Sequence, residues 1–173
     1  TVEPTQGTTV TAGAGAEIFN DYREREFFAS GSARFGNVAS GLYAHAEGTQ
    51  TTASGKQAHA EGAKTVASGD NAHAEGSGTK ATDLDSHSEG ASTTASGFCS
   101  HAEGYQTNAN GSYSHAEGNG TTASGQYSHA EGQDTTASGY YAHAEGADTI
   151  ASAWNAHAEG LGTVASGDGS HAE

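Results

Sequence analysis

A strict period of 14 residues constrains this chain more than any other feature of its sequence. All ten histidines fall on this period, and each is followed two residues later by a glutamate. Between successive His-Glu pairs lies a threonine, which is followed two residues later by an alanine. A fixed repeat of this length predicts a solenoid, in which each repeat forms one coil that stacks on its neighbours.

Each repeat divides into two halves of the form small-x-Ala-x-Gly, such as residues 100–104 and 107–111. Successive side chains of a strand point to opposite faces, so each half is expected to form a five-residue strand with Ser, Thr and Ala inside. His101 and Glu103 would then point outward. The glycine that ends each half permits a sharp turn, including a positive φ.

The composition fits a very thin coil. Only 33% of the residues are apolar and most of these are Ala, whereas an ordinary globular core needs more Leu, Ile, Val and Phe. The space between two short strands is large enough only for small residues, namely Ala, Ser, Thr and Gly. We therefore expect an all-β parallel β-solenoid of roughly ten coils, about 45 Å long at a strand spacing of about 4.8 Å. Glycine every seven residues disfavours helices.

The formal net charge of -15 excludes several classes of function. It repels phosphate backbones and anionic lipids, so we expect no nucleic-acid partner. No apolar run is long enough to cross a bilayer, which argues against membrane insertion. No cofactor motif is present, and an enzyme is not expected. Ser100 and His101 are adjacent on one strand and point to opposite faces, so they cannot form a nucleophile-base pair.

A single chain of this kind has little apolar area to bury. At about 25 cal/mol per Å², an alanine core hardly balances the conformational entropy lost in ordering each coil. Thin scaffolds gain stability by oligomerising. The His-Glu pair is fixed in every coil while its turn neighbours vary, which indicates a repeated environment such as an axis shared by several subunits.

The paired small-x-Ala-x-Gly halves over residues 37–173 resemble the head repeats of YadA-type trimeric autotransporter adhesins. The resemblance implies a left-handed parallel β-roll and a homotrimer around a threefold axis. In that family Val and Ile stand at the positions of His101 and Glu103 and face the trimer interior. By this resemblance a ladder of polar residues lines the trimer interface here: His45, Glu47, His59, Glu61, His73, Glu75, His87, Glu89, His101, Glu103, His115, Glu117, His129, Glu131, His143, Glu145, His157, Glu159, His171 and Glu173.

The wording Ser-His-Ala-Glu-Gly also resembles fibre proteins of Gram-positive bacteria and their phages, which often carry a self-cleaving C-terminal chaperone domain. Both resemblances imply an extracellular place on a cell surface or virion. The expected function is a non-enzymatic, rigid trimeric fibre segment for host or surface attachment, with a host glycan or matrix protein as ligand. The alternative is a passive shaft or spacer that positions another domain.

The outward His and Glu columns are interpreted as a structural hydrogen-bond network across subunits. No metal site is assigned, although imidazole with carboxylate also suits Zn, Ni or Cu, and His protonation also suits a pH sensor. Acidification below about pH 5, where Glu begins to protonate, is expected to weaken the trimer.

Two further surface columns carry candidate functions. Aromatic residues gather just before the His strand and form a candidate ligand surface or a cover for the subunit seam: Tyr113, Tyr127, Tyr140, Tyr141 and Trp154. An outward threonine column resembles the threonine arrays of ice-binding solenoids. An ordinary strand surface is the favoured interpretation, because five residues interrupt the column: Val66, Lys80, Asn108, Ile150 and Val164.

The chain is expected to have three parts. Residues 1–15 are interpreted as a flexible or linker segment, 16–36 as an N-terminal cap for the open end of the solenoid, and 37–173 as the β-roll. Within the β-roll, Asp83 and Ala153 replace the second glycine of their repeats. Because Asp tolerates turn conformations, the coil is expected to persist there with a local change.

Overall fold

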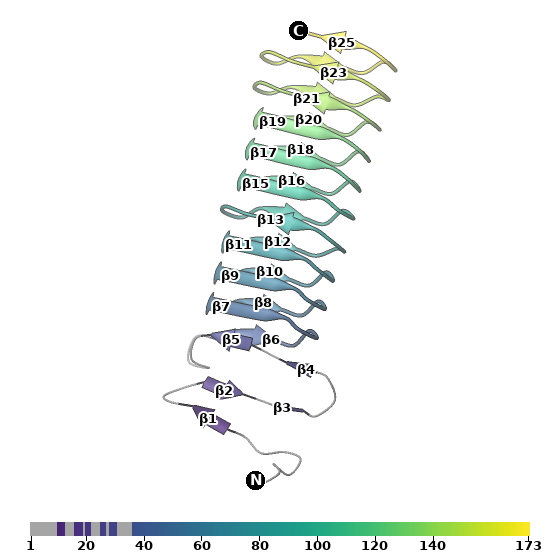
Figure 1. The fold of residues 1–173 in the computed structure, drawn as a ribbon. Coiled ribbons are helices and arrows are strands. Elements are labelled where there is room, and N and C mark those ends of the chain that lie inside the picture. Colours follow the sequence, from purple (N-terminus) through teal and green to yellow (C-terminus); the bar gives the residue numbers. More distant parts are fainter. Residues whose placement is uncertain (1–9, 13–15, 19, 22–24, 27, 31–35) are drawn as a thin grey trace.

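The 14-residue period of the sequence is the coil of a parallel β-solenoid, as predicted (Figure 1). In the computed structural model, residues 10–12, 16–18, 20–21, 25–26, 28–30 and 36–173 are described, with side chains from residue 36 onward. Each coil contributes one strand to each of two parallel sheets, so the sheets form two long sides of a rod. No helix in the described ranges is long and apolar enough to cross a membrane.

The first sheet has 11 strands and carries the His-Glu pairs. Its strands are β5 (Phe28–Ser30), β7 (His45–Thr49), β9 (His59–Ala63), β11 (His73–Ser77), β13 (His87–Ser88), β15 (His101–Tyr105), β17 (His115–Asn119), β19 (His129–Gln133), β21 (His143–Ala144), β23 (His157–Ala158) and β25 (His171–Ala172). From β7 onward every strand pairs in parallel with the equivalent strand 14 residues later, so His73 pairs with His87 and Glu103 with Glu117.

The second sheet has ten strands of two residues each. They are β6 (Val38–Ala39), β8 (Thr52–Ala53), β10 (Val66–Ala67), β12 (Lys80–Ala81), β14 (Thr94–Ala95), β16 (Asn108–Ala109), β18 (Thr122–Ala123), β20 (Thr136–Ala137), β22 (Ile150–Ala151) and β24 (Val164–Ala165). The five-residue strand expected for this half of the repeat is therefore wrong. The N–H groups of Ser54 and Gly55 both donate to the carbonyl of Ala67, at 2.9 and 3.4 Å, and this convergence ends the ladder after Ala53.

The core between the sheets consists of small residues, as the composition predicted. The alanine columns, such as Ala102, Ala109 and Ala116, are fully buried, and so are the threonines represented by Thr107. Where Ser88 replaces the usual alanine, its hydroxyl lies 2.8 Å from the hydroxyl of the buried Thr93. At this position the buried hydroxyl has a hydrogen-bond partner, whereas the hydroxyls of other core threonines, such as Thr107 and Thr121, have none among the described residues.

The two columns require glycine for different physical reasons. Gly104 has a φ of 103°, which confirms the predicted positive φ at the end of the first half. Gly111 lies outside the positive-φ region, so that part of the expectation is wrong for the second half. It is glycine because a Cβ there would overlap the backbone carbonyl of Gly125 in the next coil. Close stacking of coils, not a left-handed backbone, requires this residue.

Asp83 and Ala153 occupy the second glycine column without breaking the solenoid, as expected. Strands continue on both sides of each substitution. In other coils the glycine N–H donates to an alanine carbonyl of the next coil, and no such bond is found at Asp83 or Ala153 among the described residues. The carboxylate of Asp83 instead accepts a hydrogen bond from the N–H of Leu84, at 2.8 Å. These coils therefore adjust locally.

The N-terminal strands differ from the repeat. β1 (Val10–Ala12) pairs antiparallel with β2 (Ala16–Ile18), and β3 (Asn20–Asp21) pairs antiparallel with β4 (Arg25–Glu26). β5 then enters the first sheet with Phe28 beside His45, so this first coil is longer than 14 residues. The predicted linker at 1–15 lies largely outside the described residues, and the predicted cap at 16–36 lies outside them in part. Both roles stay predictions.

The histidine–glutamate ladder as candidate functional site

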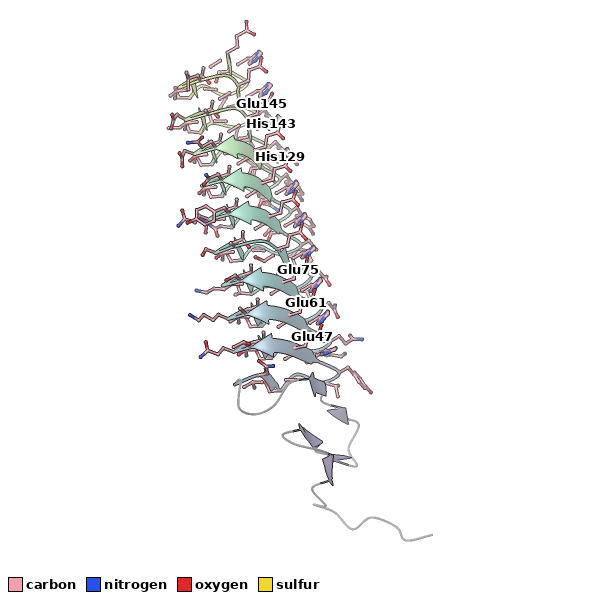
Figure 2. The ribbon with its side chains drawn as sticks, turned by 90° about the vertical axis from the view of Figure 1, so that its left-hand side faces the viewer. Glu47, Glu61, Glu75, His129, His143 and Glu145 are labelled. Carbon is pink, nitrogen blue, oxygen red and sulfur yellow. The ribbon has the colours of Figure 1, made fainter. Side chains whose placement is uncertain are left out.

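The His-Glu pairs form one continuous face of the rod, here called the His–Glu ladder (the ten histidines from His45 to His171 and the ten glutamates from Glu47 to Glu173). The side chains alternate with buried alanines, so they point away from the core. Figure 2 shows labelled members projecting from the same side of the solenoid at different heights. In the nine ion pairs of the ladder the side chains are 32–43% exposed, apart from His171 at 53%.

The imidazole rings of the ladder stack on one another without a break. Neighbouring ring centroids lie 4.7–4.9 Å apart along the whole column. The ring planes deviate by 10° or less, except for 26° between His45 and His59. The in-register parallel pairing of the strands sets this spacing, because it places each histidine directly beside the next. Sequence analysis predicted the column but not the stacking.

The ion pairs of the ladder run in two directions. From His45 to His87, each Nε2 atom lies 3.5–3.8 Å from the Glu two residues later in the same coil. From His115 to His171, each Nε2 atom lies 3.1–3.6 Å from the Glu of the preceding coil. The direction reverses at His101, which takes part in none of the ion pairs found among the described residues.

Most imidazoles of the ladder lack a close hydrogen bond within one chain. In the described residues, eight of the ten Nε2 atoms, those of His45 through His143, are buried and have no hydrogen-bond partner. Only the last two coils show close hydrogen bonds, from the imidazoles of His157 and His171 to carboxylates at 3.1 and 3.2 Å. Buried polar atoms of native proteins are normally hydrogen-bonded. Most of the paired imidazoles therefore have only the longer contacts to carboxylates, at 3.5–3.8 Å, within one chain.

Burial and like charges shift the titration of this face. Burial and neighbouring histidines lower the pKa of four imidazoles: His59, His101, His129 and His143. The pKa of Glu145 is lowered chiefly by its hydrogen bond with His157. A hydrogen bond between neighbouring carboxyls lowers the pKa of Glu117 and raises that of Glu131. Neutral forms of these four imidazoles are thus favoured at neutral pH, so their contacts with carboxylates become ion pairs only when the histidine is protonated.

The predicted aromatic surface is brought together at one corner of the rod. Tyr113, Tyr127 and Tyr141 occupy the same turn position with φ of 57–59°, and neighbouring rings stack at 5.0 Å. Tyr140 lies edge-on to Tyr141 and stacks on Trp154 at 5.1 Å. Trp154 is 61% exposed. The residues form a continuous exposed cluster, whereas their role in binding stays a prediction.

One apolar surface near the last coils was not predicted from the sequence, although Ile150 and Val164 were recognised as interruptions of the threonine column. Leu161, Val164 and Ile150 are 77, 56 and 40% exposed, and Ile150 pairs with Val164 in the second sheet. A signal was present, because branched apolar residues replace the polar threonine column there. The threonine column itself lies on the second sheet, where Val66 and Lys80 interrupt it. Its expected role as an ordinary strand surface stays a prediction.

A family model connects this geometry with known proteins. The YadA head domain repeat matches twice, at residues 46–72 and 130–152. Both matches fall within the described coils and support YadA-type head repeats in this chain. The YadA head family is a structural adhesin family whose members are surface-exposed and form trimers in general. A search of curated proteins finds no match to the chain.

Proposed function

We propose that the chain is a rigid segment of a trimeric surface fibre that serves attachment, and that the His–Glu ladder faces the other two subunits. The observation that carries this proposal is the unbroken face of stacked imidazoles and carboxylates along the first sheet, whose side chains are still about one third exposed in a single chain. A threefold arrangement would cover this face with the same face of two other chains. The YadA-type repeats at residues 46–72 and 130–152 support a trimer. The proposal also includes a left-handed roll with residues 16–36 as its N-terminal cap.

The first prediction concerns the number of subunits. Native mass spectrometry should find three chains of 17.3 kDa each in one particle. Reversing two ladder charges, with Glu117→Lys and Glu131→Lys, should dissociate the particle because unpaired cations would be buried between subunits. A control pair, Asp134→Lys and Asp148→Lys, makes the same charge change in a turn column where Lys64 already stands.

The control pair should leave the trimer intact. A monomeric wild-type chain would overturn the proposed arrangement. Equal dissociation by both pairs would show that total charge, rather than the ladder, holds the subunits together.

The second prediction concerns attachment. The aromatic cluster presents exposed ring surface, which suits a glycan or a matrix protein because aromatic rings combine apolar area with a polar edge. The full chain should bind in a glycan and matrix-protein screen, and Trp154→Ala should lower that binding at least about tenfold. Leu161→Ala is the matched control, because it removes a similarly exposed apolar side chain outside the cluster. If wild type binds no ligand, the passive spacer function is favoured over attachment.

A further inference from the structure

The carboxylates of the ladder can each reach two imidazoles. The carboxylate of Glu75 lies 3.7 Å from the Nε2 atom of His73 in its own coil. The carboxylate of Glu145 instead lies 3.1 Å from the Nε2 atom of His157 in the next coil. The two positions have the same backbone register, so each glutamate has access to the histidine before it and to the histidine one coil later.

Three donor atoms consequently converge between adjacent coils. In the group of His143, Glu145 and His157, one ligand atom from each residue lies within 4.8 Å of the others. The group of His157, Glu159 and His171 repeats this arrangement one coil later. In the N-terminal half the converging groups hold one imidazole and two carboxylates, such as Glu61, His73 and Glu75, so a glutamate there must turn toward the next coil to complete the same donor set. Two imidazoles with one carboxylate form a donor set that suits Zn²⁺, Ni²⁺ and Cu²⁺, whereas Mg²⁺ and Ca²⁺ prefer oxygen ligands alone.

The ladder has two physical reasons to accept a cation. The Nε2 atoms of His101 and of seven other ladder histidines are buried without a hydrogen-bond partner, and a metal ion would provide one. The glutamates also repeat at the strand spacing, where two unit charges repel by about 1 kcal/mol even in water. A cation bound between coils would remove part of this repulsion.

We propose that the His–Glu ladder binds divalent transition-metal ions between adjacent coils, each ion held by two neighbouring imidazoles and the intervening carboxylate of one chain. A metal lies about 2.0–2.1 Å from a coordinating imidazole nitrogen. Parallel rings 4.9 Å apart, such as those of His143 and His157, must therefore tilt out of their stack to share one ion. All donors come from one chain, so the proposal does not depend on the trimer.

This geometry fixes the number of ions. Each ion uses two histidines, and one imidazole is not shared between two ions. Ten histidines therefore hold at most five ions per chain. Equilibrium dialysis of the full chain against Zn²⁺ or Cu²⁺ at neutral pH, followed by elemental analysis, should approach five bound ions. An excess of Mg²⁺ should not displace them. The electron paramagnetic resonance spectrum of the Cu²⁺ complex should show coupling to two nitrogens.

Two variants with the same number of substitutions test the pairing of histidines. The alternating variant replaces every second ladder histidine by Gln, at His59, His87, His115, His143 and His171, and leaves no adjacent pair. The block variant replaces His45, His59, His73, His87 and His101 by Gln and leaves five consecutive histidines. We expect the alternating variant to lose tight binding and the block variant to retain two ions.

Equal binding by the two variants would overturn the proposal, because it would show that single histidines or carboxylates suffice. Should either variant fail to fold by circular dichroism, a wild-type Cu²⁺ spectrum without nitrogen coupling would overturn it as well. Native mass measured in EDTA separates this inference from the proposed function. A metal-free trimer that binds no Zn²⁺ would refute the metal sites alone, and a monomer that binds five ions would refute the trimer alone.

Discussion

The Gly118→Ala variant should lose more than about 3 kcal/mol of folding free energy, the largest effect that we expect from any single methyl group in the chain. Gly118 has a φ of 107°, which an alanine adopts only with strain. An added Cβ would also overlap the backbone carbonyl of Gly132 in the next coil, and a backbone cannot rotate away as a flexible side chain can. Urea unfolding followed by circular dichroism would measure the loss.

Gly78→Ala is the control for this experiment. Gly78 has a φ of 70°, and the nearest atoms to an added Cβ, both in Ser92 of the next coil, lie 3.8 and 4.0 Å away. It should therefore show only the cost of the left-handed backbone, about 1–2 kcal/mol. If both variants lost the same amount, backbone strain alone would explain the glycine column, and close stacking of coils would not.

Acidification should destabilise the protein from about pH 6.5 downward, in EDTA so that no metal contributes. Burial lowers the pKa of His59, His101, His129 and His143 below 6.5. The unfolded chain then binds protons that the folded chain does not, so the stability from neutral imidazoles is complete above about pH 6.5 and is lost as the pH falls toward the folded pKa values. The lowered pKa of Glu117 and Glu145 extends the loss below pH 4.5, and the raised pKa of Glu131 opposes it in part.

Thermal melts at pH 7.5 and pH 5.5 would check this prediction, because most carboxylates stay ionised across that interval. The melting midpoint of wild type should be lower at pH 5.5 than at pH 7.5. The alternating histidine-to-glutamine variant should fall less, since half of its imidazoles are gone. A wild-type midpoint that stays constant or rises would contradict the prediction. The structure thus places the onset at higher pH than the glutamates alone indicated.

Much of the fold could be predicted because one spacing decides it. The histidine period gave the coil length, and alternation around Ala102 gave the inner and outer faces, both of which the structure confirms. The short second strand could not be predicted from alternation. It depends on two N–H groups, those of Ser54 and Gly55, that converge on one carbonyl. The pattern of apolar and polar residues does not predict which N–H groups converge on one carbonyl.

The candidate site was predicted as two columns of residues and not as a bonded network. The period alone placed all ten histidines on one face. It could not show that the partner of each histidine changes at His101 from the Glu of the same coil to the Glu of the preceding coil. Every coil around His101 has the same His-x-Glu sequence. The direction of each pair depends on the side-chain rotamer of the glutamate. Likewise, contact between Tyr140 and Trp154 depends on ring orientation at a turn.

Because every coil contacts its neighbours in the same way, mutations can change the length of this rod by whole coils. Each coil meets its neighbours through the same columns, so duplication of any 14 consecutive residues inserts a coil that already fits above and below. Unequal recombination between repeats would lengthen or shorten the rod in steps of about 4.8 Å without creating a new interface. An insertion of half a repeat would instead place the Thr, Val, Lys, Asn or Ile of the second sheet in the histidine column. Selection can therefore adjust the reach of the molecule one whole coil at a time.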